Sequence, residues 1–143
     1  MKPPVLLRIA AAIDLLYFAA HTAGAPWTPA RAPAELAVLE AMRTHGFQAE
    51  GFARTYWDFY FGFGVAISGF LLVQAVALWQ LASLARSDAA RLRSVVTSFL
   101  VAFVFNAVVA WKYFFPLPAL MAGVIAVCLA LAVWAARPVR AGC

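Results

Sequence analysis

Two ionisable side chains lie inside the first apolar run of the sequence. Asp14 stands nine residues after Val5, where the run begins, and His21 follows seven residues later. Seven residues are close to two turns of an α-helix, so a helix would place both side chains on one face. An ionised side chain at the centre of a bilayer costs about 2.5–3.5 kcal/mol, so each group needs a partner or a function. Together, an acid and an imidazole can exchange protons with a bound molecule.

The second apolar run opens with charged and aromatic residues. Arg54 and Asp58 are four residues apart, which is the spacing of an ion pair on a helix. Tyr56 and Trp57 stand between them. The group suits contact with a ligand, and it equally suits a charge pair that fixes the helix end within an interfacial aromatic belt.

The third apolar run carries polar residues in its outer half. Asn106 interrupts the run, and Lys112 and Tyr113 close it. Helix faces turned inward would bring these groups and those of the first two runs into one polar pocket. We expect this pocket to open toward the extracytoplasmic side and to be walled by aromatic rings.

Such a pocket predicts binding of a hydrophobic small molecule or lipid, such as a quinone, an isoprenoid or a sterol-like lipid. Its acid and imidazole groups would suit an acid–base transformation of the bound molecule. Asp14 or Asp58 would act as acid or base, with His21 as partner. Asn106 and Tyr56 would orient the ligand. The structural alternative is that Asp14 and Asn106 form interhelical hydrogen bonds and that His21 bonds to a loop carbonyl.

No metal and no cofactor are expected. A metal or haem ligand is the weaker interpretation of His21, because no second histidine lies at ligand spacing and His45 falls in a loop. Cys128 and Cys143 have neither zinc-site spacing nor a pattern that favours a disulfide. Nucleotide-binding loops, nucleophile elbows and metalloprotease motifs are absent from the sequence.

The composition indicates a membrane protein. Hydrophobic residues make up 66% of the 143 residues, against about 45–50% in a soluble domain, and charged residues fall to 12%. A soluble fold of this size could not bury so much apolar surface, whereas lipid covers it. The net charge of +5 comes from basic residues beside the apolar runs, which is typical of orienting charges and argues against a nucleic-acid partner.

The apolar runs predict an all-α fold, a four-helix transmembrane bundle forming a single domain over 1–143. The expected spans are 5–24, 55–80, 92–115 and 118–136. Between the second and third spans we expect a polar hinge over 81–93, with Ser87 as the N-cap of the next helix. Small residues at helical spacing predict close helix approach in two spans. They are Gly62, Ala66 and Gly69, and Ala122, Ala126 and Ala130.

The segment 25–53 differs from the spans. Leu36, Leu39 and Met42 repeat at three-residue spacing after Pro33, which predicts a short amphipathic helix over 33–45 on the membrane surface or capping the bundle.

Basic residues predict that both termini are cytoplasmic, in a bacterial inner membrane, with the 25–53 segment outside. Seven lie on the inner side and four on the outer. The inner ones are Lys2, Arg8, Arg86, Arg91, Arg93, Arg137 and Arg140, and the outer ones are Arg31, Arg43, Arg54 and Lys112. A cleaved signal peptide is the alternative for the first run, but its internal charges favour a retained span.

Five segments of the sequence follow a recognisable pattern. They read HTAG at 21–24, RTYWDFYFGFG at 54–64, LWQLASL at 78–84, DAARLR at 88–93 and YFF at 113–115. In this order they resemble a family of small bacterial membrane proteins, in which position 55 is a serine. The resemblance covers most of the chain and implies four spans, but it implies no activity and no catalytic residue.

Two other functions stay open. The small-residue faces and the incomplete catalytic sets suit a structural or accessory subunit of a larger membrane complex, or a homo-oligomer. A small oligomeric transporter would need a polar path through the membrane, and the inner halves of the helices offer little beyond Arg8 and Gln74.

Overall fold

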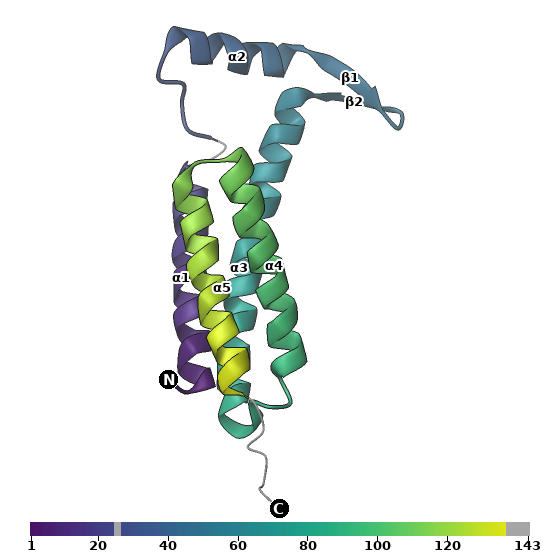
Figure 1. Ribbon diagram of the computed structural model, residues 1–143. Helices are drawn as coiled ribbons and strands as arrows, with labels where there is room; N and C mark the ends of the chain where they lie inside the picture. Colours follow the sequence, from purple (N-terminus) through teal and green to yellow (C-terminus); the bar gives the residue numbers. More distant parts are fainter. Residues whose placement is uncertain (25–26, 137–143) are drawn as a thin grey trace, which may run out of the picture. The chain divides into compact units, whose positions relative to one another are not determined.

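The computed structural model describes residues 1–24 and 27–136, and this part of the chain is mostly helical (Figure 1). Four helices are long and apolar enough to cross a membrane. They are α1 (Pro3–Gly24), α3 (Tyr56–Asp88), α4 (Arg93–Tyr113) and α5 (Pro116–Ala135). A short helix, α2 (Pro33–Thr44), precedes the strands β1 (Gly46–Ala49) and β2 (Phe52–Thr55). The chain is therefore a multi-pass membrane protein, and the predicted four-helix fold with a short helix between the first two spans is confirmed.

The chain divides into two compact units. Within the described residues, the first, called here the four-helix unit, contains 1–17 and 71–136; the second, the 18–70 unit, contains the described residues between them. Arg137 and Arg140, which contribute to the predicted orientation, lie outside the described residues.

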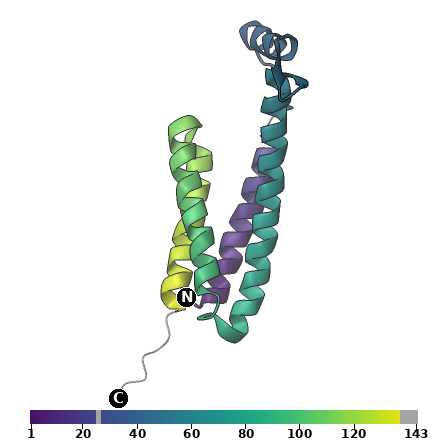
Figure 2. The ribbon, with the colours of Figure 1, turned by 90° about the vertical axis from the view of Figure 1, so that its right-hand side faces the viewer.

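Each helix of the four-helix unit buries one narrow stripe of mostly small and aliphatic residues. On α4 this stripe is Val96, Phe103 and Ala110, spaced seven residues apart as in a left-handed helix pair. Helices α4 and α5 form a closely packed hairpin, and they lie side by side in Figures 1 and 2. The wide opposite face of α4 is apolar and exposed, as a lipid-facing surface must be.

Two predicted small-residue faces need correction. Gly62, Ala66 and Gly69 are exposed, and the buried small residues in this part of α3 are Gly64 and Ser68. Gly62 lies two positions before Gly64 and Ala66 two before Ser68, and side chains two positions apart on a helix point to nearly opposite sides. The predicted face therefore lies on the exposed side of α3.

On α5 the buried face begins as predicted, with Ala122 and Ala126, but it continues through Leu129 and Ala132 and leaves Ala130 exposed. Each step of four residues turns the face by about 40°, so a run of such steps drifts away from the core.

Helix α3 is longer than predicted, since it continues to Asp88 instead of ending near residue 80. Its 33 residues span about 50 Å. Ser87 is therefore inside the helix, where its Oγ donates to the Leu84 carbonyl at 2.8 Å, and the N-cap of α4 is Leu92. The turn between the helices is closed by the Arg91 N–H, which donates to Asp88 Oδ1 at 3.0 Å.

The 18–70 unit contains an unpredicted β-hairpin after α2. Strands β1 and β2 pair antiparallel, with Ala49 opposite Phe52. Glu50 and Gly51 form the two-residue turn, with φ of 50° and 85°. Two consecutive positive φ angles are typical of a type I′ turn, which matches the twist of paired strands. Glycine at the second position was the one sequence signal for this hairpin.

Aromatic contacts join the hairpin and α2 to the start of α3. The Arg43 guanidinium lies over the Trp57 ring at 4.5 Å from its centroid. The Phe47 ring lies 5.1 Å from that of Tyr56 and 5.2 Å from that of Phe59. Helix α2 buries no residue, so these few contacts fix its place in the unit.

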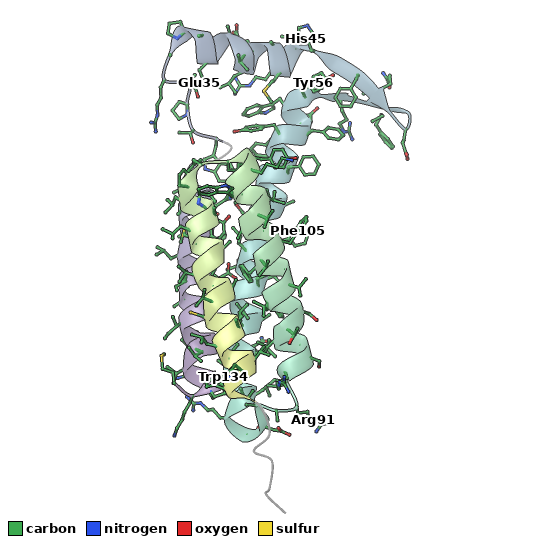
Figure 3. The ribbon with its side chains drawn as sticks, viewed as in Figure 1. Glu35, His45, Tyr56, Arg91, Phe105 and Trp134 are labelled. Atoms are coloured by element: carbon green, nitrogen blue, oxygen red, sulfur yellow. The ribbon has the colours of Figure 1, made fainter. Side chains whose placement is uncertain are left out.

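A pair of phenylalanines on α4 tests this packing. Phe103 is 1% exposed, whereas Phe105, labelled in Figure 3, is 69% exposed. We expect Phe103→Ala to lower the free energy of unfolding by about 3 kcal/mol, because it leaves a cavity. Phe105→Ala should leave it nearly unchanged. Unfolding in mixed micelles, titrated with a denaturing detergent, measures both, and similar losses would contradict the assigned rotation of α4.

Candidate functional site

The structure places the predicted site residues in four groups, two in each unit. Asp14 and Asn106 form one group of the four-helix unit, and Lys112 with Tyr113 the other. In the 18–70 unit, His21 stands apart from the group at the start of α3, which is Arg54, Tyr56, Trp57 and Asp58. Convergence of all four groups on one pocket stays a prediction.

Asp14 is the most unusual residue of the four-helix unit. Its side chain is fully buried, and neither carboxyl oxygen has a hydrogen-bond partner among the described residues. Tyr17 lies nearly one turn later on α1 and is also buried, and its side chain lies near those of Asp14 and of Asn106 on α4. Two predicted residues, Asp14 and Asn106, therefore lie in one polar cluster with a buried tyrosine that was not predicted.

The nearest basic residue along α1 does not compensate Asp14. The Arg8 guanidinium lies over the Trp79 ring, 5.4 Å from its centroid. Burying a polar group without a partner costs free energy, and burying an unpaired charge costs more. The Asp14 carboxyl can therefore hydrogen-bond with a polar group that enters the core. Without such a group, its burial lowers the stability of the fold.

His21 has a partner in a different helix. Its Nδ1 lies 3.1 Å from Ser68 Oγ, and the Thr22 hydroxyl donates to the same oxygen at 3.0 Å. Ser68 is 7% exposed and belongs to α3. It is the lone polar residue of the apolar stretch 61–73, which is the signal that could have identified it. The cluster ties the end of α1 to α3 within the 18–70 unit.

Asp58 caps the start of α3. The Thr55 N–H donates to Asp58 Oδ2 at 2.7 Å, and the Asp58 N–H donates to Thr55 Oγ1 at 3.2 Å. This reciprocal pair is a capping box. Arg54 lies on β2, before the helix begins, so the spacing of four residues does not place it on the helix surface with Asp58. Its Nη1 donates instead to the Ala53 carbonyl at 2.7 Å.

The last predicted group lies at the end of α4. Lys112 Nζ is 5.2 Å from the centroid of the Tyr113 ring, and Tyr113 is exposed. A lysine and a tyrosine at a helix end are typical of an interfacial anchor.

A cleft of about 300 Å³ lies in the 18–70 unit and was not predicted. It is lined by Gly24, Thr28, Pro29, Arg31, Glu35, Leu39 and Tyr60. The Arg31 N–H donates to Glu35 Oε2 at 2.7 Å, at the start of α2, where Figure 3 labels Glu35. Arg31 and Glu35 stand four residues apart among three prolines, and this charge pair was the available sequence signal.

Among the described residues there is no group of three or more His, Cys, Asp or Glu side chains that could hold a metal ion. Comparison with known proteins adds no family, because no protein-family model, curated protein or solved structure matches the chain.

Substitution of Asp14 tests its burial. Asp14→Asn should leave stability close to wild type, because the amide has the same shape and no charge. Asp14→Lys should lower the free energy of unfolding by about 3 kcal/mol, because an unpaired ammonium would replace it in the core. Thermal unfolding in mild detergent measures both. Glu40→Lys, the same charge change on the exposed face of α2, is the control; equal effects at the two positions would contradict the burial of Asp14.

Ser68→Ala tests the hydrogen bonds between α1 and α3. We expect a loss of about 1 kcal/mol, because His21 and Thr22 both lose their partner. Ser83→Ala is the control on the same helix, since the Ser83 hydroxyl donates to its own helix at the Trp79 carbonyl. Faster amide hydrogen exchange around residues 18–24 in Ser68→Ala alone would support the contact, and identical exchange in the two variants would contradict it.

Proposed function

We propose that this membrane protein binds an amphiphilic small molecule or lipid, and that the polar head group occupies the cleft of the 18–70 unit. The cleft itself is the observation that carries the proposal. Its volume of about 300 Å³ lies at the lower end of the range for ligand pockets. Arg31, Glu35 and Thr28 supply polar groups, while Pro29, Leu39 and Tyr60 supply apolar surface.

The charges of the cleft favour a zwitterionic head group. The Arg31 guanidinium can bind a phosphate, and the Glu35 carboxylate and the Tyr60 ring can receive an ammonium group. A phosphoethanolamine head group carries both charges at a short separation. The cleft thus supports a phospholipid or a molecule of similar head-group chemistry.

The aromatic start of α3 supports a place for the apolar part of the ligand. The Tyr60 ring lies 5.6 Å from that of Trp57, which lies 6.1 Å from that of Phe61. Phe61 in turn contacts Trp27 at 6.1 Å in an edge-on arrangement. Rings of this kind gather at the level of lipid head groups, where one end of an amphiphile is wet and the other is apolar.

Binding is favoured over turnover at the cleft. The Thr28 hydroxyl donates a hydrogen bond to the Gly24 carbonyl, and the Glu35 carboxylate accepts one from the Arg31 backbone N–H. Neither forms the pair of nucleophile and base that covalent catalysis requires. An acid–base role for Asp14 and His21 remains a separate hypothesis, and it needs a ligand that reaches the core.

The predicted orientation complements this function. With the termini in the cytoplasm of a bacterium, the cleft would face the outer side of the inner membrane and would sample the outer leaflet. Membership of the family of small four-span bacterial membrane proteins that the sequence resembles would agree with this location.

A second candidate function is that of a subunit in a larger membrane complex. Gly62, Ala66 and Gly69 are exposed, and a Cβ added at Gly62 or Gly69 would meet no atom within 4 Å. Such a small-residue face allows close approach of a helix from another chain. Co-purification of a partner chain at a fixed ratio, lost in Gly62→Leu, would favour this function over ligand binding.

Native mass spectrometry with oleoyl-lysophosphatidylethanolamine tests the proposed binding. We expect the detergent-purified protein to bind this probe, and Arg31→Gln to weaken binding about tenfold, because it removes a charge-assisted contact with phosphate. Arg91→Gln, a matched substitution outside the cleft, should bind like wild type. Equal affinity of Arg31→Gln and wild type would refute the cleft as the head-group site.

A further inference from the structure

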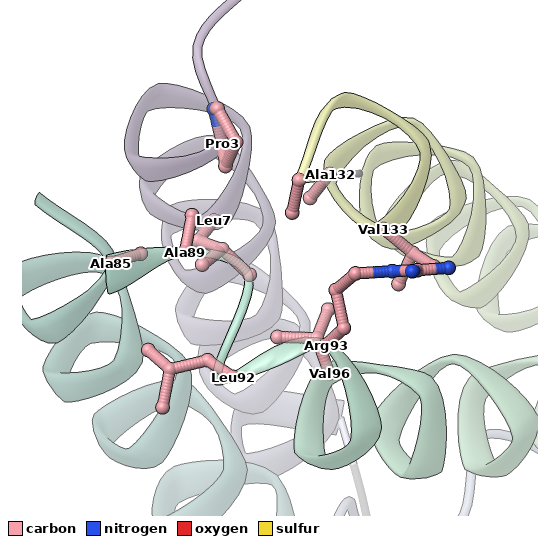
Figure 4. Close-up of a pocket in the computed structure, with 10 residues that line it drawn as sticks. Pro3, Leu7, Ala85, Ala89, Leu92, Arg93, Val96, Ala132 and Val133 are labelled. Atoms are coloured by element: carbon pink, nitrogen blue, oxygen red, sulfur yellow. The ribbon is translucent and has the colours of Figure 1, made fainter. Parts of the chain in front are cut away.

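The four-helix unit has a polar surface that the proposed function does not use, at the end where α1 and α4 begin. All four helices meet there around a cavity of about 10 Å³, the size of a single water. Leu7 of α1, Ala85 of α3, Val96 of α4 and Ala132 of α5 line it, as Figure 4 shows. Arg93 lies at the rim of this cavity, and its side chain extends toward Val133.

Basic residues dominate this end of the unit. They are Lys2, Arg8, Arg86, Arg91 and Arg93. Only two acidic residues, Asp14 and Asp88, belong to the described part of the unit. Asp14 is buried in the core, and Asp88 offsets at most one of the five basic groups, so this end keeps a surplus of positive charge.

Two of these arginines are held by their surroundings. The Nε atoms of Arg8 and Arg93 are buried and have no hydrogen-bond partner among the described residues. The Arg8 guanidinium also lies over the Trp79 ring. A guanidinium held in this way loses less side-chain freedom when it binds an anion, and its Nη atoms remain the donors for that anion.

Exposed tryptophans place the basic end at the membrane surface. Trp79 is 52% exposed and Trp134 is 63% exposed. Figure 3 shows Trp134 and Arg91 at the same end of the four-helix unit. Tryptophan prefers the head-group level of a bilayer, so the guanidinium groups lie where lipid phosphates are found. The neighbouring surface is exposed and apolar, with Val95 on α4 and Leu131 on α5.

We infer that the basic end of the four-helix unit is an interaction surface for anionic phospholipid, with Arg8 and Arg93 as its fixed contacts. The phosphate would accept hydrogen bonds from the guanidinium Nη atoms, and the acyl chains would pack on the adjacent apolar helix surface. A surplus of cationic groups selects anionic over zwitterionic lipid, which distinguishes this surface from the cleft of the 18–70 unit.

Lipid selectivity in native mass spectrometry tests the inference. The purified protein receives equal amounts of phosphatidylglycerol and phosphatidylcholine with identical acyl chains. We expect a preference for phosphatidylglycerol that falls about fivefold in Arg8→Gln and again in Arg93→Gln. The preference should also fall as ionic strength rises, because the contacts lie at the surface. Arg93→Lys should keep most of it, since the charge remains.

Two controls separate the possible outcomes. Arg31→Gln changes the cleft of the 18–70 unit and should leave the preference for phosphatidylglycerol intact. The lipid preference of the basic end can therefore be measured whether or not the cleft binds a head group. Arg86→Gln combined with Arg91→Gln alters exposed charges only, and it should lower the preference even if Arg8→Gln or Arg93→Gln fails to fold. The inference is overturned if these variants keep the wild-type preference, or if inorganic phosphate displaces phosphatidylglycerol at equal concentration.

Discussion

The absence of hydrogen-bond partners in lipid is the constraint on which this structure depends. Backbone groups in the membrane must bond within their own segment, which is why the four apolar runs are helices. Polar side chains must find partners in the same way, and most of those described do. His21 and Thr22, for example, both form a hydrogen bond with the Ser68 hydroxyl. Asp14 is the acidic exception: neither oxygen of its buried carboxyl has a partner among the described residues, as is also true of Nε in Arg8 and Arg93. A chain that retains such a group accepts a loss of stability, and this gives Asp14 its interest as a site for an entering polar molecule.

The two units use different interactions. The four-helix unit relies on narrow stripes of small and aliphatic residues, with a single large residue, Phe103, in the stripe of α4. The 18–70 unit has few buried residues and relies on aromatic contacts, a capping box and a two-residue turn. An interior of packed aliphatic side chains leaves little room for a ligand, whereas a unit joined by sparse contacts leaves a cleft. The open cleft therefore occurs where the packing is loosest.

Much of the fold could be predicted because composition and run length are direct consequences of the membrane. The rotation of each helix could not be predicted. Side chains two positions apart on α3 face opposite ways, and lipid is as apolar as a neighbouring helix, so the sequence does not mark which face is buried. Glycines 62 and 64 therefore looked alike in the sequence.

The hairpin was missed because its turn depends on the backbone angles of Glu50 and Gly51. Helix α3 was predicted too short because the polar residues Arg86 and Ser87, although they end the apolar run, do not end the helix. For the site, the place of Asp14 inside a span followed from the apolar run around it, whereas its burial depends on helix rotation. The cleft arises from a loop that carries no periodic pattern.

The length of α3 has a mechanical consequence. Its neighbours have 20 to 22 residues, which matches the hydrocarbon thickness, whereas its 33 residues exceed that thickness by about 20 Å. Tilting by ordinary angles does not shorten its projection to that thickness, so α3 has turns that extend beyond the hydrocarbon layer. A bilayer that thickens therefore leaves the three shorter helices too short for its hydrocarbon layer, whereas α3 is still long enough to cross it.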